Sequence, residues 1–354
     1  MNTIKTALFS TLTLSLLSTS LLAKNDTTVS GEGQLYYYTT SDETLFDEKS
    51  TSSAGAVTFD IKHKVSDSMS ANFTTIGYSH LGKKAGTIYM EGSRTGSFFN
   101  VVNLTGVQND ISFVLGRQLL DTPMLGSFDW LLAPSAFEAY TLGYKVNNNI
   151  SVIGSYVNKF RDHNTGDSFK KLKDQNYAVG VAYRDDIEAN LWFYRVDELD
   201  YSQFYLDATE AIDGFDVSLQ AVSTSYGAGE DSLSYGVKAS SKASGLNYSL
   251  ALNHIAKRET GMVGVDSIYT SSWNTFSSQN IGNSWKAEIT DDVTAGLSTT
   301  LSYAEYETLG HELDLILSYP FSSSVSLDAI YANTQYEEDS SAENSLEFVA
   351  KYSF

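Results

Sequence analysis

The sequence predicts an all-β protein: a transmembrane antiparallel β-barrel of about eighteen strands, with sixteen as the alternative count. Three observations predict this fold class. Segments of about ten residues alternate apolar and polar side chains, which is the period of a strand. The 354 residues include only 3 prolines but 23 tyrosines and 18 phenylalanines, and strands favour aromatic residues. Short and long connections also alternate along the chain, as expected of a barrel threaded through a membrane.

The first 23 residues are expected to form a signal peptide. Lys5 supplies a positive start, residues 7–22 are apolar but rich in Ser and Thr, and Ala23 is a small residue at a cleavable position. The segment is short and hydroxyl-rich for a membrane helix, which needs about 20 apolar residues. A retained N-terminal anchor is the alternative. We therefore assign residues 1–23 to the signal peptide and residues 24–354 to an outer-membrane β-barrel.

The chain after this segment is strongly acidic. Removing Lys5 from the 23 basic residues leaves 22, against 43 acidic residues, for a net charge near −21. Such a charge argues against nucleic acid as a partner. The chain has no Cys, which excludes disulfides and thiol chemistry and removes the easiest metal ligands. No cofactor and no metal site is expected.

Four segments show the alternation of side chains most clearly: 56–67, 232–241, 293–303 and 311–321. In the first of these, Val57, Phe59 and Ile61 share one face of the predicted strand. In a soluble sandwich the apolar face would point inward, whereas in a membrane barrel it points outward to lipid. The alternation alone does not separate a barrel from a soluble periplasmic all-β protein, which is the alternative.

The connections favour the barrel. We expect strands to begin near residues 28, 54, 69, 98, 111, 136, 149, 176, 187, 201, 215, 232, 245, 283, 293, 311, 324 and 344. Every second connection is a tight turn rich in Asn, Asp, Ser or Gly, such as residues 212–214 and 290–292, and these residue types tolerate turn conformations. Most of the other connections are longer. A membrane barrel explains this rhythm, with turns on the periplasmic rim and loops outside, and about eighteen strands enclose a lumen wide enough for an aqueous channel.

The chain ends in the sequence LEFVAKYSF, which alternates apolar residues with mostly polar ones. We expect Tyr352 and Phe354 to lie at the lipid boundary, in the aromatic girdle of a membrane barrel. A terminal Phe is also similar to the C-terminal signature of bacterial outer-membrane proteins.

Residues 116–140 break the rhythm of strands and turns. They hold two of the three prolines, with an apolar stretch between them, and the preceding strand, 111–120, is apolar on both faces. Both features are explained if loop 122–135 folds into the barrel, packs on the inner wall of that strand and narrows the pore. An Arg that faced lipid would cost about 2–4 kcal/mol, so Arg117 is expected to point inward. The predicted constriction consists of Arg117, Ser127, Asp129 and Trp130.

The residues that form a pattern in this segment are Gly116, Gln118, Pro123, Ser127, Asp129, Leu132, Pro134, Phe137 and Glu138. This pattern resembles the third-loop motif of the OprD-type porins, eighteen-stranded substrate channels of outer membranes. A long seventh loop, 258–282, contains GVDSIY and is also similar to the family. Two positions depart from the family pattern, since Trp130 stands where an Arg is usual and Ala139 where a Gly is usual. The chain is also shorter than typical members, so the family's selectivity is not carried over.

The resemblance implies passive uptake of small hydrophilic solutes, often carboxylate-bearing nutrients or amino acids. In the family, a row of basic residues guides a carboxylate past an acidic pocket made by inward loops. Alternation places the following basic residues on the lumen side: Lys62, Lys64, Lys145, Lys159, Arg161, Lys238, Lys257 and Lys351. The acidic residues on the lumen side include Asp60, Glu288, Asp314 and Glu347.

We therefore expect a diffusion channel, without enzymatic activity, in the outer membrane of a Gram-negative bacterium. Its partners would be outer-membrane lipids, lipopolysaccharide and small hydrophilic solutes. The sequence leaves open the solute, the sign of ion selectivity and the oligomeric state, for which a homotrimer is one alternative. The other function considered is an outer-membrane barrel enzyme or adhesin without a continuous pore, which would not conduct steadily in a planar bilayer.

Overall fold

The structure is a computed structural model that describes residues 26–41, 44–82, 88–294, 296–337 and 341–354. The predicted signal peptide, residues 1–23, lies outside the described residues. Two short 3-10 turns, η1 (Met90–Gly92) and η2 (Ser277–Gln279), occur among the strands. No helix in the described part of the chain is long and apolar enough to cross a membrane.

Nineteen strands occur in the described residues. They are β1 (Thr27–Thr40), β2 (Thr51–Ser66), β3 (Met69–His80), β4 (Thr95–Gln108), β5 (Ile111–Gln118), β6 (Ala136–Lys145), β7 (Ile150–Arg161), β8 (Lys170–Lys171), β9 (Asn176–Arg184), β10 (Ile187–Val196), β11 (Tyr201–Ile212), β12 (Phe215–Tyr226), β13 (Ser232–Ala243), β14 (Leu246–Ala256), β15 (Gly282–Thr294), β16 (Leu297–Tyr306), β17 (Gly310–Pro320), β18 (Val325–Gln335) and β19 (Glu343–Ser353). β8 is only two residues long and pairs with the end of β7.

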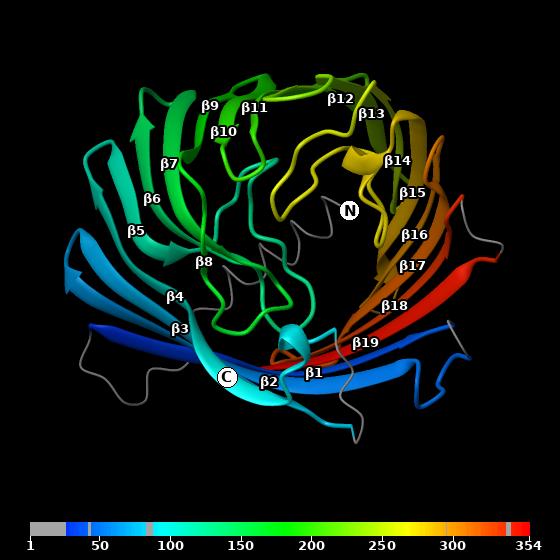
Figure 1. Cartoon of the computed structure of the whole chain (residues 1–354), viewed down its shortest axis with the longest axis horizontal. Helices are drawn as coiled ribbons and strands as arrows, with labels where there is room; N and C mark the ends of the chain where they lie inside the picture. Colours follow the sequence, from blue (N-terminus) through cyan, green and yellow to red (C-terminus); the bar gives the residue numbers. More distant parts are fainter. Residues whose placement is uncertain (1–25, 42–43, 83–87, 295, 338–340) are drawn as a thin grey trace.

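The other eighteen strands form a closed antiparallel ring, as the sequence predicts (Figure 1). Each long strand pairs with the next long strand in the chain, and the last, β19, pairs with the first, β1. Closure satisfies the backbone N–H and C=O groups of every strand without leaving an edge among the described strands. Complete pairing of this kind is what a sheet needs in a hydrocarbon environment.

The tight turns at one end of the ring are built from residues that adopt positive φ angles. Asp213 and Gly214 have φ angles of 50° and 84°, and Ser244 and Gly245 have φ angles of 54° and 86°. Two successive positive φ angles match the type I′ hairpin, whose twist fits the strands that it joins. The turn predicted at residues 212–214, and the similar turn at residues 244–245, are therefore explained by their local sequence.

One predicted turn lies four residues further along the chain. The sequence Thr290-Asp291-Asp292 was expected to turn, with the next strand beginning at residue 293. Instead β15 continues to Thr294 with a register shift after Asp291, and β16 begins at Leu297. The prediction was wrong because aspartates are compatible with an irregular strand end, whereas Gly296, with a φ of 81°, supplies the turn conformation.

The wall of the ring is apolar outside and polar inside. Many apolar side chains are exposed on the outer face, among them Val57, Phe59, Leu142, Leu219, Leu250 and Leu301. Side chains of the opposite parity are buried and polar, among them Gln203, Gln220, Thr224, Ser234, Asn253, Thr300 and Ser302. This arrangement is the reverse of a soluble protein and is that of a barrel that meets lipid on its outside.

The exposed aromatic residues at the turn end of the ring include the C-terminus. Phe354 and Tyr352 are 41% and 54% exposed and stack with ring centroids 5.9 Å apart. The backbone N–H of Phe354 donates to the Gly31 carbonyl at 3.0 Å, and its ring lies where a Cβ on Gly31 would stand. The terminal residue is thus fastened to β1 and belongs to the outer aromatic band that the sequence predicts.

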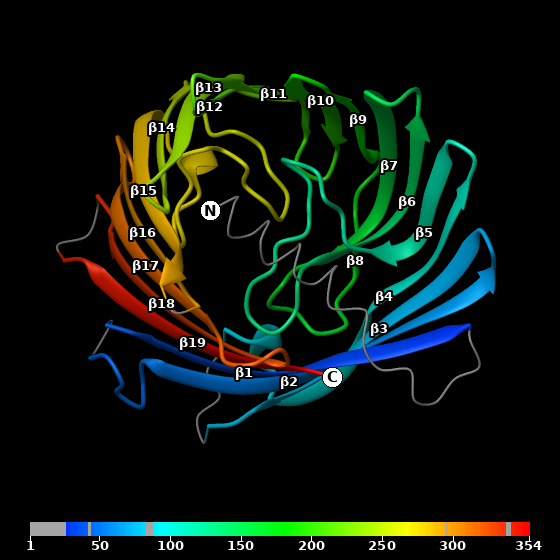
Figure 2. The ribbon, with the colours of Figure 1, turned by 180° about the vertical axis from the view of Figure 1, so that it is seen from behind.

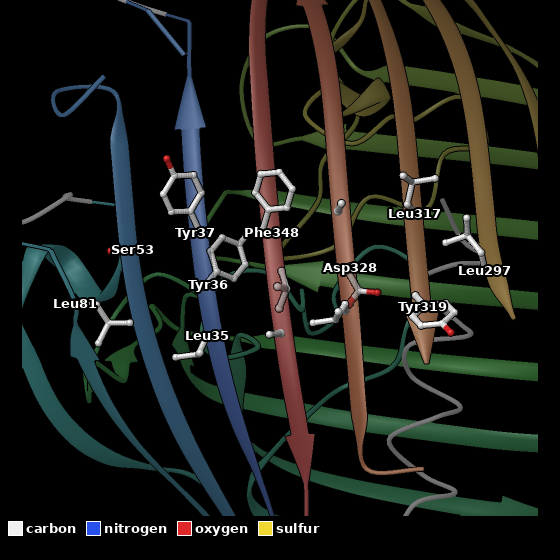
Figure 3. Close-up of a pocket in the computed structure, with 14 residues that line it drawn as sticks. Leu35, Tyr36, Tyr37, Ser53, Leu81, Leu297, Leu317, Tyr319, Asp328 and Phe348 are labelled. Carbon is white, nitrogen blue, oxygen red and sulfur yellow. The ribbon is translucent and has the colours of Figure 1, made fainter. Parts of the chain in front are cut away.

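A shallow groove interrupts the outer face over β1, β19, β18, β17 and β16 (Figure 3). Its volume is about 500 Å³, and Leu35, Tyr37, Leu317, Tyr319 and Phe348 surround it. The small side chains of Ala329 and Ala350 lie among these larger ones, which explains the hollow. The groove is almost wholly apolar, as is the rest of the outer band.

A charge placed on the outer face should cost more than the same charge on the inner face. Leu250 is 51% exposed on the outside of β14, and its neighbour Ser249 faces the interior. Leu250→Arg should lower the free energy of unfolding by about 2–4 kcal/mol, since a guanidinium near the bilayer midplane is poorly solvated. Ser249→Arg is the control and should change it little. Urea titration in lipid vesicles measures both, and equal costs would contradict the assignment of the faces.

Candidate functional site

Three loops lie inside the ring rather than outside it. They are loop 3 (residues 119–135), loop 4 (162–175) and loop 7 (257–281), coloured teal, green and yellow in Figure 1. Figure 2 shows the same three segments within the ring from the opposite side. The interior is therefore partly occupied by chain, and the contacts of these loops define the candidate site.

Loop 3 crosses the interior from one wall to the other. Near its start, Leu120, Met124 and Leu125 pack in a buried cluster with inward-facing residues of β10, β11 and β12, including Trp192 and Tyr194. Near its tip, Leu131, Leu132 and Ala133 pack in a second cluster that contains residues of β1, β2, β17, β18 and β19. Met124 donates its backbone N–H to the hydroxyl of Tyr194 at 3.4 Å. Each end of loop 3 is thus held by an apolar area of the inner wall.

This packing differs from the prediction that loop 3 rests on the inner face of residues 111–120. That face is occupied at its end by Gln118, whose amide donates to the Ala139 carbonyl at 2.8 Å. The hydroxyl of Thr141 donates to the Gln118 side-chain oxygen at 2.9 Å. The apolar residues of loop 3 pack with Leu120 at the end of the predicted strand, but mainly with inward residues of β10–β12 and of the β17–β19 wall.

Two serines fasten loop 3 to itself. The side-chain oxygen of Ser127 accepts the Leu120 backbone N–H at 3.0 Å, and that of Ser135 accepts the Phe128 backbone N–H at 2.7 Å. Ser127 is 5% exposed, so its role in the structure is to close the loop. By contrast Asp129 is exposed on the same loop, with its charge available to the interior of the barrel.

Loops 3 and 7 are joined by backbone hydrogen bonds. Gly126 donates to the Val263 carbonyl at 3.0 Å, and Val263 donates to the Met124 carbonyl at 2.9 Å. Gly264 has a φ of 77°, and a Cβ there would lie 2.2 Å from the Gly126 carbonyl oxygen. The close approach of these two loops therefore requires glycine at this position.

An aromatic cluster joins all three loops. Phe128 of loop 3 lies 5.1 Å from the His163 ring of loop 4 and 5.7 Å from Phe276 of loop 7, centroid to centroid. Trp130 lies 5.3 Å from His163. Burial works against the charge of Asp162, but the hydrogen bond and charge of its neighbour His163 hold the pKa of Asp162 below its usual range.

Arg161 is the anchor of loops 3 and 4. Its side chain is fully buried and donates to the carbonyls of Pro134 in loop 3 and of Asp162 and Thr165 in loop 4. Its Nε also donates to the Asn100 side chain at 3.0 Å. A buried guanidinium needs such partners for its donors, and here the partners are the backbones of two inward loops.

Carboxylates on β17 and β19 hold loop 7. Glu312 accepts the Asn274 backbone N–H at 2.7 Å and the Thr275 hydroxyl at 2.6 Å. Asp314 accepts the Trp273 backbone N–H at 3.2 Å. Glu347 accepts the indole N–H groups of both Trp130 and Trp273. These buried acids are therefore acceptors for loop backbone and loop side chains.

The structure distributes the predicted lumen bases over several places. Lys62 and Lys145 are exposed near the turn ends of β2 and β6, and Lys64 pairs with Asp67 in the adjoining turn at 2.7 Å. Lys257 is exposed just after β14 with a φ of 68°. Three others make specific contacts: Lys159 with Glu138 at 3.0 Å, Lys238 over the Tyr269 ring at 5.2 Å, and Arg161 as described. Lys351 has inward parity on β19, opposite Gln34 of β1 and Ser326 of β18. The eight residues do not form one continuous row.

Arg117 lies where β5 ends and loop 3 begins. Its guanidinium donates to the Phe99 carbonyl at 2.9 Å, pairs with Asp167 of loop 4 at 3.1 Å and lies over the Phe169 ring at 4.1 Å. Of the predicted constriction residues, Ser127 closes loop 3, Trp130 joins it to Glu347, and Asp129 is exposed. The structure thus brings Ser127, Asp129 and Trp130 together on loop 3. The strand register sets Arg117 opposite Val102 and Glu138, on the parity of exposed Leu115 and not on that of the inward Gln118, so the expectation that Arg117 points inward is wrong. Its ion pair with Asp167 and its contact with Phe169 satisfy the guanidinium at the rim.

The remaining predicted acids are Asp60 and Glu288. Asp60 accepts the Thr74 hydroxyl at 2.5 Å across β2 and β3, and Glu288 pairs with Lys286 at 3.0 Å. Sequence reasoning missed Lys286, Glu312 and Trp273. Alternation alone would have placed Glu312 among the inward acids, because it is two residues from Asp314 on one strand. Trp273 carries no such signal, since it lies in a loop.

Comparison with known proteins bears on the fold. No protein-family model matches the chain, and no curated protein matches its sequence. Solved structures do match. The outer membrane protein OpdK of Pseudomonas aeruginosa aligns with a TM-score of 0.79 at 14% identity, over 93% of this chain and 98% of that chain. OccK8 (OprE) of the same organism gives 0.78 at 13% identity over 93% and 98%, and OccAB3 of Acinetobacter baumannii gives 0.79 at 13% identity over 94% and 100%.

The fold is that of the OprD-type porins. The resemblance predicted from residues 116–138 is therefore confirmed at the level of fold, over nearly the full length of the solved chains. With its apolar exterior, this fold is a β-barrel whose outer face suits lipid. Because the sequence identity is so low, the chemistry of the interior must be inferred from the residues of this chain and not from those of the solved structures.

The two basic residues of β7 should differ sharply in their effect on the loops of this OprD-type barrel. Arg161→Met removes four hydrogen bonds from a buried charge and should weaken docking of loops 3 and 4 by about 3 kcal/mol. Hydrogen exchange of the amides in 122–135 and 162–169 should then become roughly 100-fold faster. Lys159→Met removes only a partly exposed pair and should cost about 0.2–1 kcal/mol. Equal exchange rates in the two variants would contradict the anchoring role.

Proposed function

We propose that the protein is a porin in the outer membrane of a Gram-negative bacterium, through which small hydrophilic solutes diffuse passively. The observation that carries the proposal is the reversed wall: apolar side chains cover the outside of a closed ring, and polar side chains line its inside. A wall of this kind suits lipid on one side and water on the other. The function needs no cofactor and no covalent chemistry.

Loop 3 is proposed as the main constriction, with loop 7 beside it. Loop 3 crosses from the β10–β12 wall to the β17–β19 wall, and any passage must lie beside such a bridge. Its exposed acid, Asp129, is close enough to Glu32 on the inner face of β1 for the two like charges to repel each other. Residues in the narrowest part of a channel govern selectivity because ions there lose part of their hydration.

The charge below loop 3 is mixed. Asp60, Glu32, Lys351 and Asp328 have inward parity on the four adjacent strands β2, β1, β19 and β18, and strand register sets them close to one another. Opposite charges at one wall offer counterparts to both the ammonium and the carboxylate of an amino acid. This patch supports amino acids, beside other small charged solutes, as the solute class.

A carboxylate solute provides a direct comparison. One solved structure holds Pseudomonas aeruginosa OpdK with vanillate. In this chain, Arg161 and Lys159 of the predicted basic residues are engaged with loops or a neighbouring carboxylate. Because OpdK is known in a structure with vanillate, vanillate is a useful test solute beside amino acids. The relative rates at which the two solutes enter vesicles that contain the protein would rank the two solute classes.

The proposed partners on the outside are outer-membrane lipids and lipopolysaccharide. Acyl chains would cover the exposed apolar band, including the groove over β1, β19 and β18 (Figure 3). Association into a homotrimer is the alternative cover for part of this band. Cross-linking in native membranes separates the two, because only a trimer yields products of three chains.

The purified protein should conduct in planar bilayers, and removing the charge of Asp129 should alter its selectivity. Asp129→Asn removes one negative charge from the exposed edge of loop 3, so the reversal potential in a KCl gradient should shift toward a lower preference for cations. Arg117→Ala removes a positive charge at the base of the loop and should shift it the other way, by less, because the guanidinium is engaged with Asp167.

Two results would separate failure of the site from failure of the function. If neither substitution alters current or selectivity while the wild-type barrel conducts, loop 3 is not the constriction. If the folded wild-type protein gives no steady conductance, the porin proposal fails, and a barrel enzyme or adhesin without a continuous pore becomes the better reading.

A further inference from the structure

One carboxylate contacts both loops that narrow the proposed channel. Glu347 lies in β19 and is 1% exposed. Its Oε2 accepts the indole N–H of Trp130 in loop 3 at 3.1 Å, and its Oε1 accepts the indole N–H of Trp273 in loop 7 at 2.7 Å. The hydroxyl of Tyr36 on β1 donates to Oε2 as well. Three donors from three separate elements thus meet on one side chain.

The chemistry makes this contact strong and hard to replace. A carboxylate in an apolar setting must be hydrogen-bonded, and Glu347 stands opposite Ile330 in the β18–β19 register, with Val349 next to it on the same face. Hydrogen bonds to an ionised acceptor are about twice as strong as neutral ones. An indole has a single donor, so each tryptophan that loses Glu347 loses its whole hydrogen-bonding capacity.

The other buried acids of this wall do not share this position. Glu312 and Asp314 receive donors from loop 7, at Trp273, Asn274 and Thr275. Arg161 holds loops 3 and 4. Glu347, by contrast, receives side-chain donors from loops 3 and 7 together.

We propose that Glu347 is a positioning residue that sets the width of the passage by holding loops 3 and 7 through one shared carboxylate. The inference rests on the proposed porin function. It assigns Trp130, which stands where the resembled family usually has an Arg, to fastening the loop rather than to contacting the solute. Because the two indoles share an acceptor, the effect of each tryptophan should depend on Glu347 being present.

Single-channel recording in planar bilayers tests this dependence. Trp130→Phe and Trp273→Phe each remove one hydrogen bond to a charged group and should raise the fraction of time spent in a wider or noisier open level by roughly 10-fold or more. Glu347→Ala should raise it at least as much as the two tryptophan changes together. Adding Trp130→Phe or Trp273→Phe to Glu347→Ala should then produce a fold-change of about one, since the shared acceptor is already gone.

Asp207→Asn is the matched control. Asp207 is another carboxylate of the inner wall and is partly buried. It accepts hydrogen bonds from the Asn190 side chain on the neighbouring strand β10 at 2.6 Å and from the Tyr205 hydroxyl on its own strand, β11, at 2.7 Å. Its loss removes the same charge without releasing loop 3 or loop 7. The fraction of time in the wider level should stay at the wild-type value in this variant.

The outcomes are decisive in each direction. If Glu347→Ala matches Asp207→Asn, or if the tryptophan changes keep their full effect in the Glu347→Ala background, the positioning role is refuted while the pore stands. If the wild type does not conduct, the proposed function itself fails. Heat-modifiable migration and β-sheet circular dichroism confirm folding, and Glu347→Gln, which keeps the shape of the side chain and one acceptor, should show an intermediate effect in case Glu347→Ala does not fold.

Discussion

Hydrogen bonding between the first and last strands is the constraint on which the rest of the structure depends. A strand in hydrocarbon has no water to satisfy its backbone, so an open sheet would leave two unpaired edges. β1 pairs with β2 along one side and with β19 along the other. Once the ring is closed, the period of two decides the environment of each side chain, because one parity meets lipid and the other encloses the interior.

The interior then presents a problem of its own, since inward loops must be held in place by a wall that is largely polar. The wall holds the loops in two ways. Apolar areas of the wall, which include Trp192 and Tyr194, pack against the apolar residues Met124 and Leu125 of loop 3. Buried charges, namely Arg161, Glu312 and Glu347, bind loop backbone and indole groups. Alternation identifies these charged side chains only as inward, whereas in the structure they hold the loops in place. Fewer charged side chains are therefore left to contact a solute.

Local signals account for what could be predicted from the sequence. Alternation and turn residues such as Asp213-Gly214 located the strands, and the apolar stretch between Pro123 and Pro134 indicated an inward loop. The docking partners could not be predicted, because Trp130 and Glu347 are separated by 217 residues. Alternation shows which way a side chain faces but not what meets it there, so Arg161 and Lys159 looked alike although only Arg161 is buried.

The seam between the two ends of the chain has a consequence for assembly. Tyr36 on β1 and Glu347 on β19 are 311 residues apart and touch only across that seam. A sheet in which β1 and β19 are not yet paired therefore lacks the complete Glu347 site that binds both tryptophans. Closure of the ring and the geometry of the two inward loops are therefore coupled, because an open sheet would lack the Tyr36 donor that completes the Glu347 site.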